Sequence, residues 1–224
     1  MLSERIRNIE QRIADACARG GRTRDEVTLV AVTKTLPASI INEAIATGLH
    51  DIGENRVQEY LSKRDELGTH RFHMIGHLQR NKVRQILDVV SLIHSVDSLA
   101  LAEEIDRVAA ARGTAVDVLV EVNSSGESSK FGVAPDDVPA LCDAITRLPR
   151  IRLRGLMTVA EFVADPEVLR PAFRRMRELR DELARTHSPG IRELSMGMTN
   201  DFEIAIEEGA TLIRLGSAIF GARE

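Results

Sequence analysis

The first twenty residues alternate apolar and polar positions with the period of a helix. Apolar side chains recur three or four residues apart, at Leu2, Ile6, Ile9, Ile13 and Cys17. This spacing gathers them on one face of an α-helix, and the pair of glycines at positions 20 and 21 is typical of a helix end. The sequence therefore predicts an N-terminal amphipathic helix over residues 1–20.

Beyond residue 27 the pattern changes to short apolar runs separated by longer helical patterns. Eight runs are predicted strands: Val27–Thr33, Asp51–Gly53, Phe72–Ile75, Leu92–Val96, Val116–Val122, Leu153–Val159, Glu193–Met196 and Thr211–Leu215. The helical patterns between them are Ile40–Thr47, Val57–Leu67, Lys82–Leu87, Leu99–Ala111, Val138–Leu148, Val168–Leu183 and Phe202–Glu208. Several strands are almost wholly apolar, as expected where both faces of a parallel sheet are buried.

Strands that alternate with helices in this way predict an α/β fold. The regular spacing and the number of units favour a single (β/α)8 TIM-type barrel over residues 27–221, and a doubly wound open sheet is the competing arrangement. The chain shows no linker or low-complexity tract. We therefore expect one domain spanning residues 1–224.

Composition narrows the class of protein. Hydrophobic residues make up 43% and charged residues 29% of the 224 residues, which is typical of a globular protein with a core. The formal net charge of −4 argues against a nucleic-acid partner. No apolar run predicts a membrane span or a signal peptide, and Cys17 and Cys142 fit buried thiols in a reducing compartment. We expect a cytoplasmic monomer with no membrane partner.

An amine stands at the end of the first predicted strand, in the segment Ala31-Val32-Thr33-Lys34-Thr35. Functional residues of such barrels gather at the carboxyl ends of the strands. A lysine turned to solvent is the simpler alternative, but Lys34 ends an apolar strand that points into a closed side. Partial burial favours the neutral amine, which can form an imine with an aldehyde.

The seventh and eighth predicted strands end in small and hydroxyl residues. They read Ser195-Met196-Gly197-Met198-Thr199 and Arg214-Leu215-Gly216-Ser217. Barrels often bind phosphate at these two positions, where backbone N–H groups can approach an anion. Ordinary helix capping by Thr199 or Asn200 is the alternative. Together with Lys34, the two loops predict a site for a phosphorylated aldehyde.

Three other features were weighed for chemistry. The histidines His70, His73 and His77 have a metal-like spacing, but Met74 stands where the HExxH pattern requires glutamate, so no metal site is predicted. Lys130 lies in a serine-rich stretch that does not match a phosphate-binding P-loop. Asn55 follows the second strand and either lies beside Lys34 or caps the next helix.

Seven motifs resemble, in order, those of the YggS/PROSC family of pyridoxal phosphate homeostasis proteins, which is related to the N-terminal barrel of bacterial alanine racemase. They are AVTKT (31–35), GENRVQE (53–59), FHMIGHLQRNK (72–82), EVN…ESSKFG (121–132), RGLMT (154–158), SMGMTND (195–201) and RLGSAIFG (214–221). The resemblance covers nearly the whole chain. It implies a barrel of pyridoxal phosphate fold type III.

The resemblance also implies the site. Lys34 would hold pyridoxal 5'-phosphate (PLP) as a Schiff base, with Asn55 and Arg214 close to the ring. The residues implied around the phosphate are Ser195, Gly197, Met198, Thr199, Gly216 and Ser217. Thr199 stands where many relatives carry serine, and it keeps the hydroxyl.

The implied function is intracellular PLP homeostasis without robust catalysis. It comprises storage and delivery of the cofactor and an influence on amino-acid and keto-acid balance, with amino acids and PLP-dependent apo-enzymes as possible partners. An arginine at the pyridine nitrogen cannot accept a proton and weakens the ring as an electron sink, although racemases of this barrel type also carry one. No strand-end acid is evident at the same place.

The alternative is a PLP-dependent amino-acid racemase of low activity. It would need a second acid/base on the ring face opposite Lys34. Tyr60 lies one turn into a predicted helix, whereas His73 or His77 could substitute. A third and weaker hypothesis gives the N-terminal helix an interaction role instead of a covering one.

Overall fold

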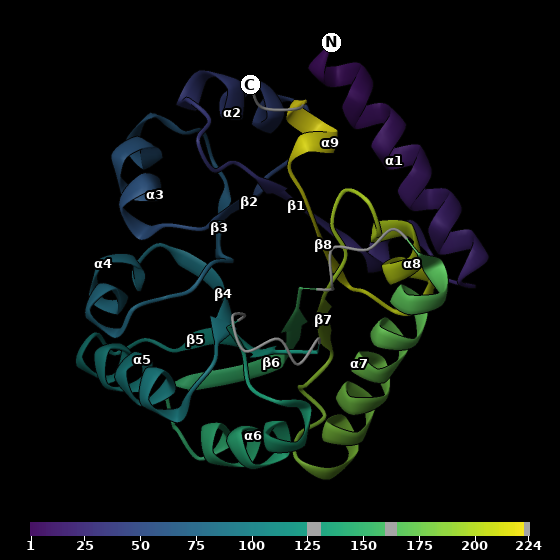
Figure 1. Ribbon diagram of the computed structural model, residues 1–224. Coiled ribbons are helices and arrows are strands. Elements are labelled where there is room, and N and C mark those ends of the chain that lie inside the picture. Colours follow the sequence, from purple (N-terminus) through teal and green to yellow (C-terminus); the bar gives the residue numbers. More distant parts are fainter. Residues whose placement is uncertain (125–130, 160–164, 222–224) are drawn as a thin grey trace.

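In the computed structural model, which describes residues 1–124, 131–159 and 165–221, eight parallel strands close into a barrel in the order β1 to β8 (Figure 1). The strands are β1 Thr28–Val32, β2 Asp51–Glu54, β3 Arg71–Met74, β4 Val90–Val96, β5 Val116–Val122, β6 Ile151–Thr158, β7 Glu193–Ser195 and β8 Leu212–Leu215. Closure is made by β8 pairing with β1, where Val30 stands opposite Arg214. The predicted TIM-type barrel is confirmed, including its second, third and seventh strands.

Helices surround the barrel on the outside (Figure 1). They are α1 Leu2–Arg19, α2 Ala38–Ala46, α3 Val57–Lys63, α4 Val83–Ile86, α5 Leu99–Ala111, α6 Val138–Thr146, α7 Pro166–Thr186, α8 Phe202–Glu207 and α9 Ser217–Phe220. Short 3₁₀ turns occupy Arg24–Glu26, Arg64–Glu66, Arg80–Lys82 and Pro135–Asp137. The sequence patterns missed α9, because four residues are too few to show a helical period. In the described part of the chain, no helix combines the length and apolarity needed to cross a bilayer.

The N-terminal helix α1 lies beside α8 and α9 at the edge of the helical ring (Figure 1). Its predicted apolar stripe is buried, with Ile9 and Ile13 at most 2% exposed. Arg12 Nε donates to Glu203 Oε1 of α8 at 2.8 Å. Because α8 has only six residues, α1 covers barrel surface that a longer helix would cover.

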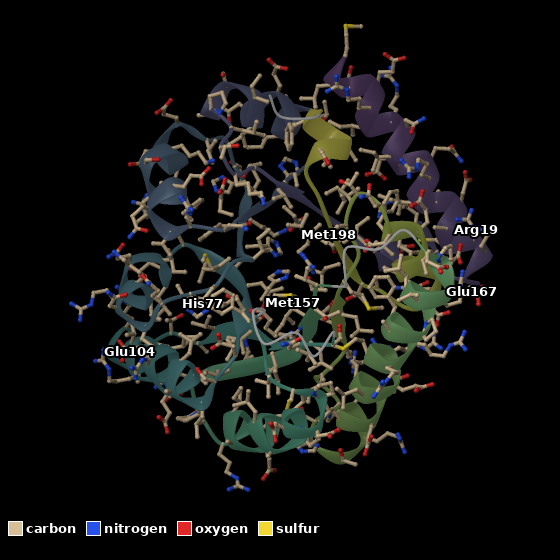
Figure 2. The ribbon with its side chains drawn as sticks, in the orientation of Figure 1. Arg19, His77, Glu104, Met157, Glu167 and Met198 are labelled. Carbon is tan, nitrogen blue, oxygen red and sulfur yellow. The ribbon has the colours of Figure 1, made fainter. Side chains whose placement is uncertain are left out.

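The space inside the barrel is filled by side chains (Figure 2), and Met157 lies near its centre. A small apolar cluster, separate from the main core between strands and helices, comprises Val30, Leu92, Leu119, Met157 and Leu212. This cluster forms the middle of the barrel interior. Polar side chains occupy the interior at both of its ends, and those at the carboxyl ends of the strands belong to the candidate site.

The arginines of α7 look like a solvated helix face in the sequence, yet three of them converge on one carboxylate. Arg170, Arg174 and Arg177 all lie within 3.1 Å of the carboxylate of Glu208, whose side chain is 4% exposed. Burial raises the pKa of Glu208, but hydrogen bonds from Arg174 and Arg170 outweigh it and lower the pKa below its usual value. This cluster anchors the end of α8, the helix that follows the loop after β7.

Candidate functional site

The lysine predicted as the reactive amine lies at the carboxyl end of the barrel. Thr33 N–H donates to the carbonyl of Gly53 at 3.0 Å, which extends the pairing of β1 with β2 by one residue. Lys34 directly follows Thr33, and Asn55 comes two residues after Gly53. Both residues therefore lie at the carboxyl ends of neighbouring strands. Asn55 does not cap the next helix, because the N-cap of α3 is Arg56.

A buried ion pair holds the backbone around Lys34. Lys63 Nζ of α3 lies 2.6 Å from Glu54 Oε1 and donates to the carbonyls of Thr33 at 2.9 Å and Leu36 at 3.3 Å. Thr33 Oγ1 also donates to Glu54 Oε1, at 2.6 Å. The Glu54 side chain is fully buried and that of Lys63 is 9% exposed. The carbonyls on both sides of Lys34 are therefore bound to one buried ammonium group.

The residue after the lysine is held in an uncommon conformation. Thr35 has φ of 64°, in the left-handed region that β-branched residues rarely adopt. Its N–H donates to Glu59 Oε1, and Lys63 Nζ lies 3.4 Å from the same oxygen. Such strain persists only where surrounding contacts over-determine it. Glu59 and Lys63 thus fix the direction in which Lys34 leaves the strand.

Replacing Lys63 with methionine should destabilise the protein by about 3–5 kcal/mol, because it leaves the Glu54 carboxylate buried and unpaired. In the described structure, Glu54 Oε2 already has no hydrogen-bond partner. Urea unfolding of Lys63→Met and of the matched control Lys82→Met measures this, and the control should change stability by less than about 0.5 kcal/mol. Equal losses in the two variants would contradict the assignment.

The loops after β7 and β8 meet, as the sequence predicted. Ser217 Oγ donates to Thr199 Oγ1 at 3.2 Å, and Ala218 N–H lies 3.4 Å from the same oxygen. Gly197 has φ of 95°, and a Cβ there would stand 2.7 Å from the Cβ of Ala205. Only glycine fits this turn, which keeps backbone rather than side chain at the loop surface. Two hydroxyls and two glycine-containing loops therefore share one place at the mouth.

Met198 and Asp201 complete the first of these loops. Met198 N–H donates to Asp201 Oδ1, and Asp201, not Thr199 or Asn200, is the N-cap of α8. Figure 2 shows Met198 between the barrel centre and α8. The capping alternative for Thr199 is thus not what the structure shows.

Ser195 has different partners from the other hydroxyls. It is fully buried at the end of β7, and its Oγ lies 2.8 Å from His94 Nδ1 and 2.5 Å from Arg214 Nη1. The structure therefore pairs Ser195 with Arg214 inside the barrel, while Thr199 pairs with Ser217 in the loops.

Arg214 is a fixed cation inside the barrel. It is 5% exposed, and its Nη2 donates to the carbonyl of Thr158 at 2.8 Å. Burial lowers the pKa of Arg214 to about 10, and the charges of Asp201 and Glu121 oppose that shift. A group with this pKa remains charged at neutral pH.

Glu121 of β5 is a buried acid whose charge acts on Arg214. It is 9% exposed, and its Oε2 has no hydrogen-bond partner among the described residues. Burial and the charge of Asp97 raise the pKa of Glu121 to about 7, while Arg214 acts in the opposite direction. The sequence showed no evident strand-end acid for this place, and Glu121 is the next-to-last residue of β5. The period of two along β5 could have shown it, because Glu121 shares a strand face with Leu119 of the inner cluster.

Glu121 should make stability fall as pH rises. Its folded pKa of about 7 lies above the ordinary 4.5, so its contribution is complete below pH 4.5 and is lost as pH rises through 7. The difference in unfolding free energy between wild type and Glu121→Gln should change by about 3 kcal/mol between pH 4 and pH 8. Urea unfolding of both proteins across this range tests it. A difference that stays constant with pH would contradict the buried, ionisable state.

The three histidines with metal-like spacing go to three different places. His70 Nε2 lies 3.1 Å from the hydroxyl of Tyr60, on the outer side of the barrel. His73 is buried inside the barrel, whereas His77 lies 3.1 Å from Asp97 and stacks on Phe131. Their spacing in the sequence does not correspond to a common site. Lys130, weighed for phosphate binding, lies outside the described residues.

Comparison with known proteins identifies the family to which this chain belongs. The family described as "Alanine racemase, N-terminal domain" matches residues 6–224. A curated "Pyridoxal phosphate homeostasis protein" from Aquifex aeolicus is 44% identical over 223 residues, covering 99% of this chain and 98% of its own. The chain belongs to the family of pyridoxal phosphate homeostasis proteins. The resemblance seen in the seven sequence motifs is thus confirmed.

Two solved structures closely resemble this fold. An unknown protein from Bifidobacterium adolescentis is 42% identical with a TM-score of 0.93, covering 98% of this chain and 94% of its own. PipY of Synechococcus elongatus, with PLP bound, is 34% identical with a TM-score of 0.86, covering 99% of this chain and all of its own. Both structures therefore share the barrel fold of this chain.

Proposed function

We propose that this chain binds PLP as a Schiff base on Lys34 and serves in intracellular PLP homeostasis, storing and delivering the cofactor. One observation carries the proposal. Lys34, whose neighbouring backbone carbonyls are bound by the buried Lys63, shares the barrel mouth with the paired hydroxyls of Thr199 and Ser217. The Lys34 amine condenses with the aldehyde, forming a C=N bond while the aldehyde oxygen leaves as water. The names of the relatives and the PLP-bound PipY structure support the same ligand.

The residues in the two loops fit a phosphate. Thr199 and Ser217 supply hydroxyl donors, and Gly197 and Gly216 bring backbone close to the anion, since Gly197 has no room for a side chain. Met198 already donates its N–H to Asp201, so we assign it to the shape of the loop. We assign Ser195 to the support of Arg214 instead of to the phosphate, because its hydroxyl accepts from Arg214.

The residues near the ring fit a holder of the cofactor. PLP supplies an electron sink when bound, and the group at its pyridine nitrogen tunes that sink. Arg214 carries only donors and stays charged, so it can offer a hydrogen bond to the nitrogen but no site for a proton. Asn55, beside Lys34, completes the ring environment in this proposal.

The racemase alternative needs a second acid/base at the mouth. Tyr60 is 3% exposed, stacks on Phe72 at 3.6 Å between ring centroids and is bonded to His70. His73 is bonded inside the barrel to Asp51. Neither of these two side chains is available at the mouth, which supports the carrier role. His77, the other histidine named for this role, follows β3 and lies 3.1 Å from Asp97, so the racemase alternative depends on His77. Amino acids and PLP-dependent apo-enzymes are the proposed recipients, and effects on amino-acid and keto-acid balance follow from delivery.

We also propose that the protein acts as a monomer in the cytoplasm. Cys17 and Cys142 are both free and buried, which suits a reducing compartment. Burial raises the pKa of the Cys142 thiol to about 12, so this cysteine is an inert part of the core.

Borohydride should fix the cofactor on Lys34. Reduction adds hydride to the carbon and a proton to the nitrogen of the C=N bond, and the resulting amine survives digestion. Peptide mass mapping of the PLP-loaded, reduced protein should find the pyridoxyl group on Lys34. Lys34→Ala should give no adduct. Modification of Lys82 or Lys130 with Lys34 unmodified would refute the assignment.

Removing the paired hydroxyls should weaken binding of the phosphorylated cofactor. The variant Thr199→Val/Ser217→Ala loses charge-assisted hydrogen bonds, each contributing about 1.5–3 kcal/mol, so the Kd for PLP should rise at least about tenfold. Binding of pyridoxal, which lacks the phosphate, should hardly change. Thr146→Val, at the end of α6, is the matched control. Wild-type affinity for PLP in the double variant would show that the loops are misassigned.

A further inference from the structure

A continuous chain of side-chain hydrogen bonds crosses the inside of the barrel. It begins at Arg214 Nη1, which donates to Ser195 Oγ at 2.5 Å, and continues from Ser195 Oγ to His94 Nδ1 at 2.8 Å. His94 Nε2 lies 2.9 Å from His73 Nδ1, and His73 Nε2 lies 2.9 Å from Asp51 Oδ1. The five residues come from β8, β7, β4, β3 and β2, so the chain joins strands on different sides of the barrel.

This chain of hydrogen bonds is shielded from water along its whole length. No member is more than 7% exposed, and Ser195 and His94 are fully buried. Polar groups in such surroundings are costly unless each one is hydrogen-bonded. Here every link between neighbours is made, inside a barrel whose middle is otherwise apolar.

The donors in this chain can point in only one direction. Arg214 can only donate, and Asp51 can only accept while it is ionised. Burial raises the pKa of Asp51, but hydrogen bonds from Arg71 and His73 outweigh it and lower the pKa to about 2. When both imidazoles are neutral, each residue between the two ends therefore accepts from the Arg214 side and donates toward Asp51.

This direction fixes the proton on each ring. Ser195 O–H donates to His94 Nδ1, His94 Nε2–H donates to His73 Nδ1, and His73 Nε2–H donates to Asp51. Each imidazole then carries one proton, on Nε2. Burial and the charges of His73 and Arg214 hold the pKa of His94 well below its usual value, which agrees with a neutral ring.

The far end of the chain lies at the opposite mouth of the barrel. Asp51 is the first residue of β2, and Arg71 Nε donates to its Oδ1 at 2.6 Å. These two residues and His73 line a cavity of about 240 Å³. The chain of hydrogen bonds thus connects the mouth that carries Lys34 with the mouth at the amino ends of the strands.

We propose that Asp51, His73 and His94 are positioning residues for the cofactor site, which hold Ser195 as a fixed acceptor for Arg214 and so orient the guanidinium toward the cofactor ring. The inference rests on the proposed function. Without a carboxylate at position 51, either tautomer of His73 satisfies its neighbours. His94 and the Ser195 hydroxyl then lose their direction, and Arg214 loses a defined partner.

The first test reads the protons directly. In full-length protein with ¹⁵N-labelled histidine, proton–nitrogen correlation spectra at neutral pH should show His73 and His94 both protonated on Nε2 and unprotonated on Nδ1. His73→Gln and His94→Gln assign the signals. A proton on Nδ1 of either ring would overturn the directed chain, whether or not cofactor binds.

The second test measures whether a change at Asp51 alters cofactor binding through Arg214, on the other side of the barrel. Asp51→Asn keeps the volume but can donate as well as accept, so it removes the fixed direction, and it also removes the ion pair with Arg71. In PLP-loaded protein it should raise the Kd for PLP about tenfold, the equivalent of one charged hydrogen bond, and shift the absorption band of the bound cofactor. In an Arg214→Lys background the same change should have little effect, because the endpoint of the chain is gone.

Controls separate this role from packing and from the proposed function. Leu119→Met alters the inner apolar cluster at nearly constant volume and should change neither readout. Equal effects of Asp51→Asn in both backgrounds would show a merely structural role and refute the proposal. If wild type forms no Lys34 adduct, the proposed function fails and the positioning role fails with it. A normal adduct with an unchanged Asp51→Asn variant refutes the positioning role alone.

Discussion

The burial of one guanidinium group constrains the interior of this barrel. A charged group removed from water is tolerated only where it is paired and hydrogen-bonded. Arg214 meets this condition through the Ser195 hydroxyl, the Thr158 carbonyl and the nearby carboxylates of Glu121 and Asp201. These partners come from the ends of β5, β6, β7 and the following loop. The position of Arg214 therefore determines which polar residues the barrel can hold at this end.

The same requirement shapes the wall that carries Lys34. Lys63 is buried because Glu54, two backbone carbonyls and Glu59 all accept from its ammonium group. A buried ion pair contributes little net stability compared with apolar packing, but it is specific in geometry. Here its acceptors include the backbone on both sides of Lys34. Lys34 thus stands on a segment fixed by contacts that the apolar core cannot provide.

The fold could be predicted from the sequence because buried parallel strands appear as apolar runs, and even the short β2, β3 and β7 formed where expected. Lys34, Thr199 and Ser217 could be found because strand ends of a barrel meet at one mouth. The partners of Ser195 and the roles of His94 and Asp51 could not, since contacts across a barrel depend on register and shear, which the sequence does not state. The arginines of α7 show the same limit, because their acceptor Glu208 lies 31 or more residues away.

The charges around Arg214 suit holding a cofactor more than transforming a substrate. Arg214 can donate to an acceptor but cannot exchange its proton near neutral pH, given a pKa of about 10. The buried ring of His94 is neutral and donates away from the mouth, so it supplies no proton there either. Glu121 is the inner group whose pKa, at about 7, allows a change of charge near neutrality. While Glu121 is protonated, the charge of Arg214 is less compensated, and a less compensated cation near the loops after β7 and β8 attracts an anionic ligand. The buried charge of Arg214 therefore serves to attract and orient an anionic ligand.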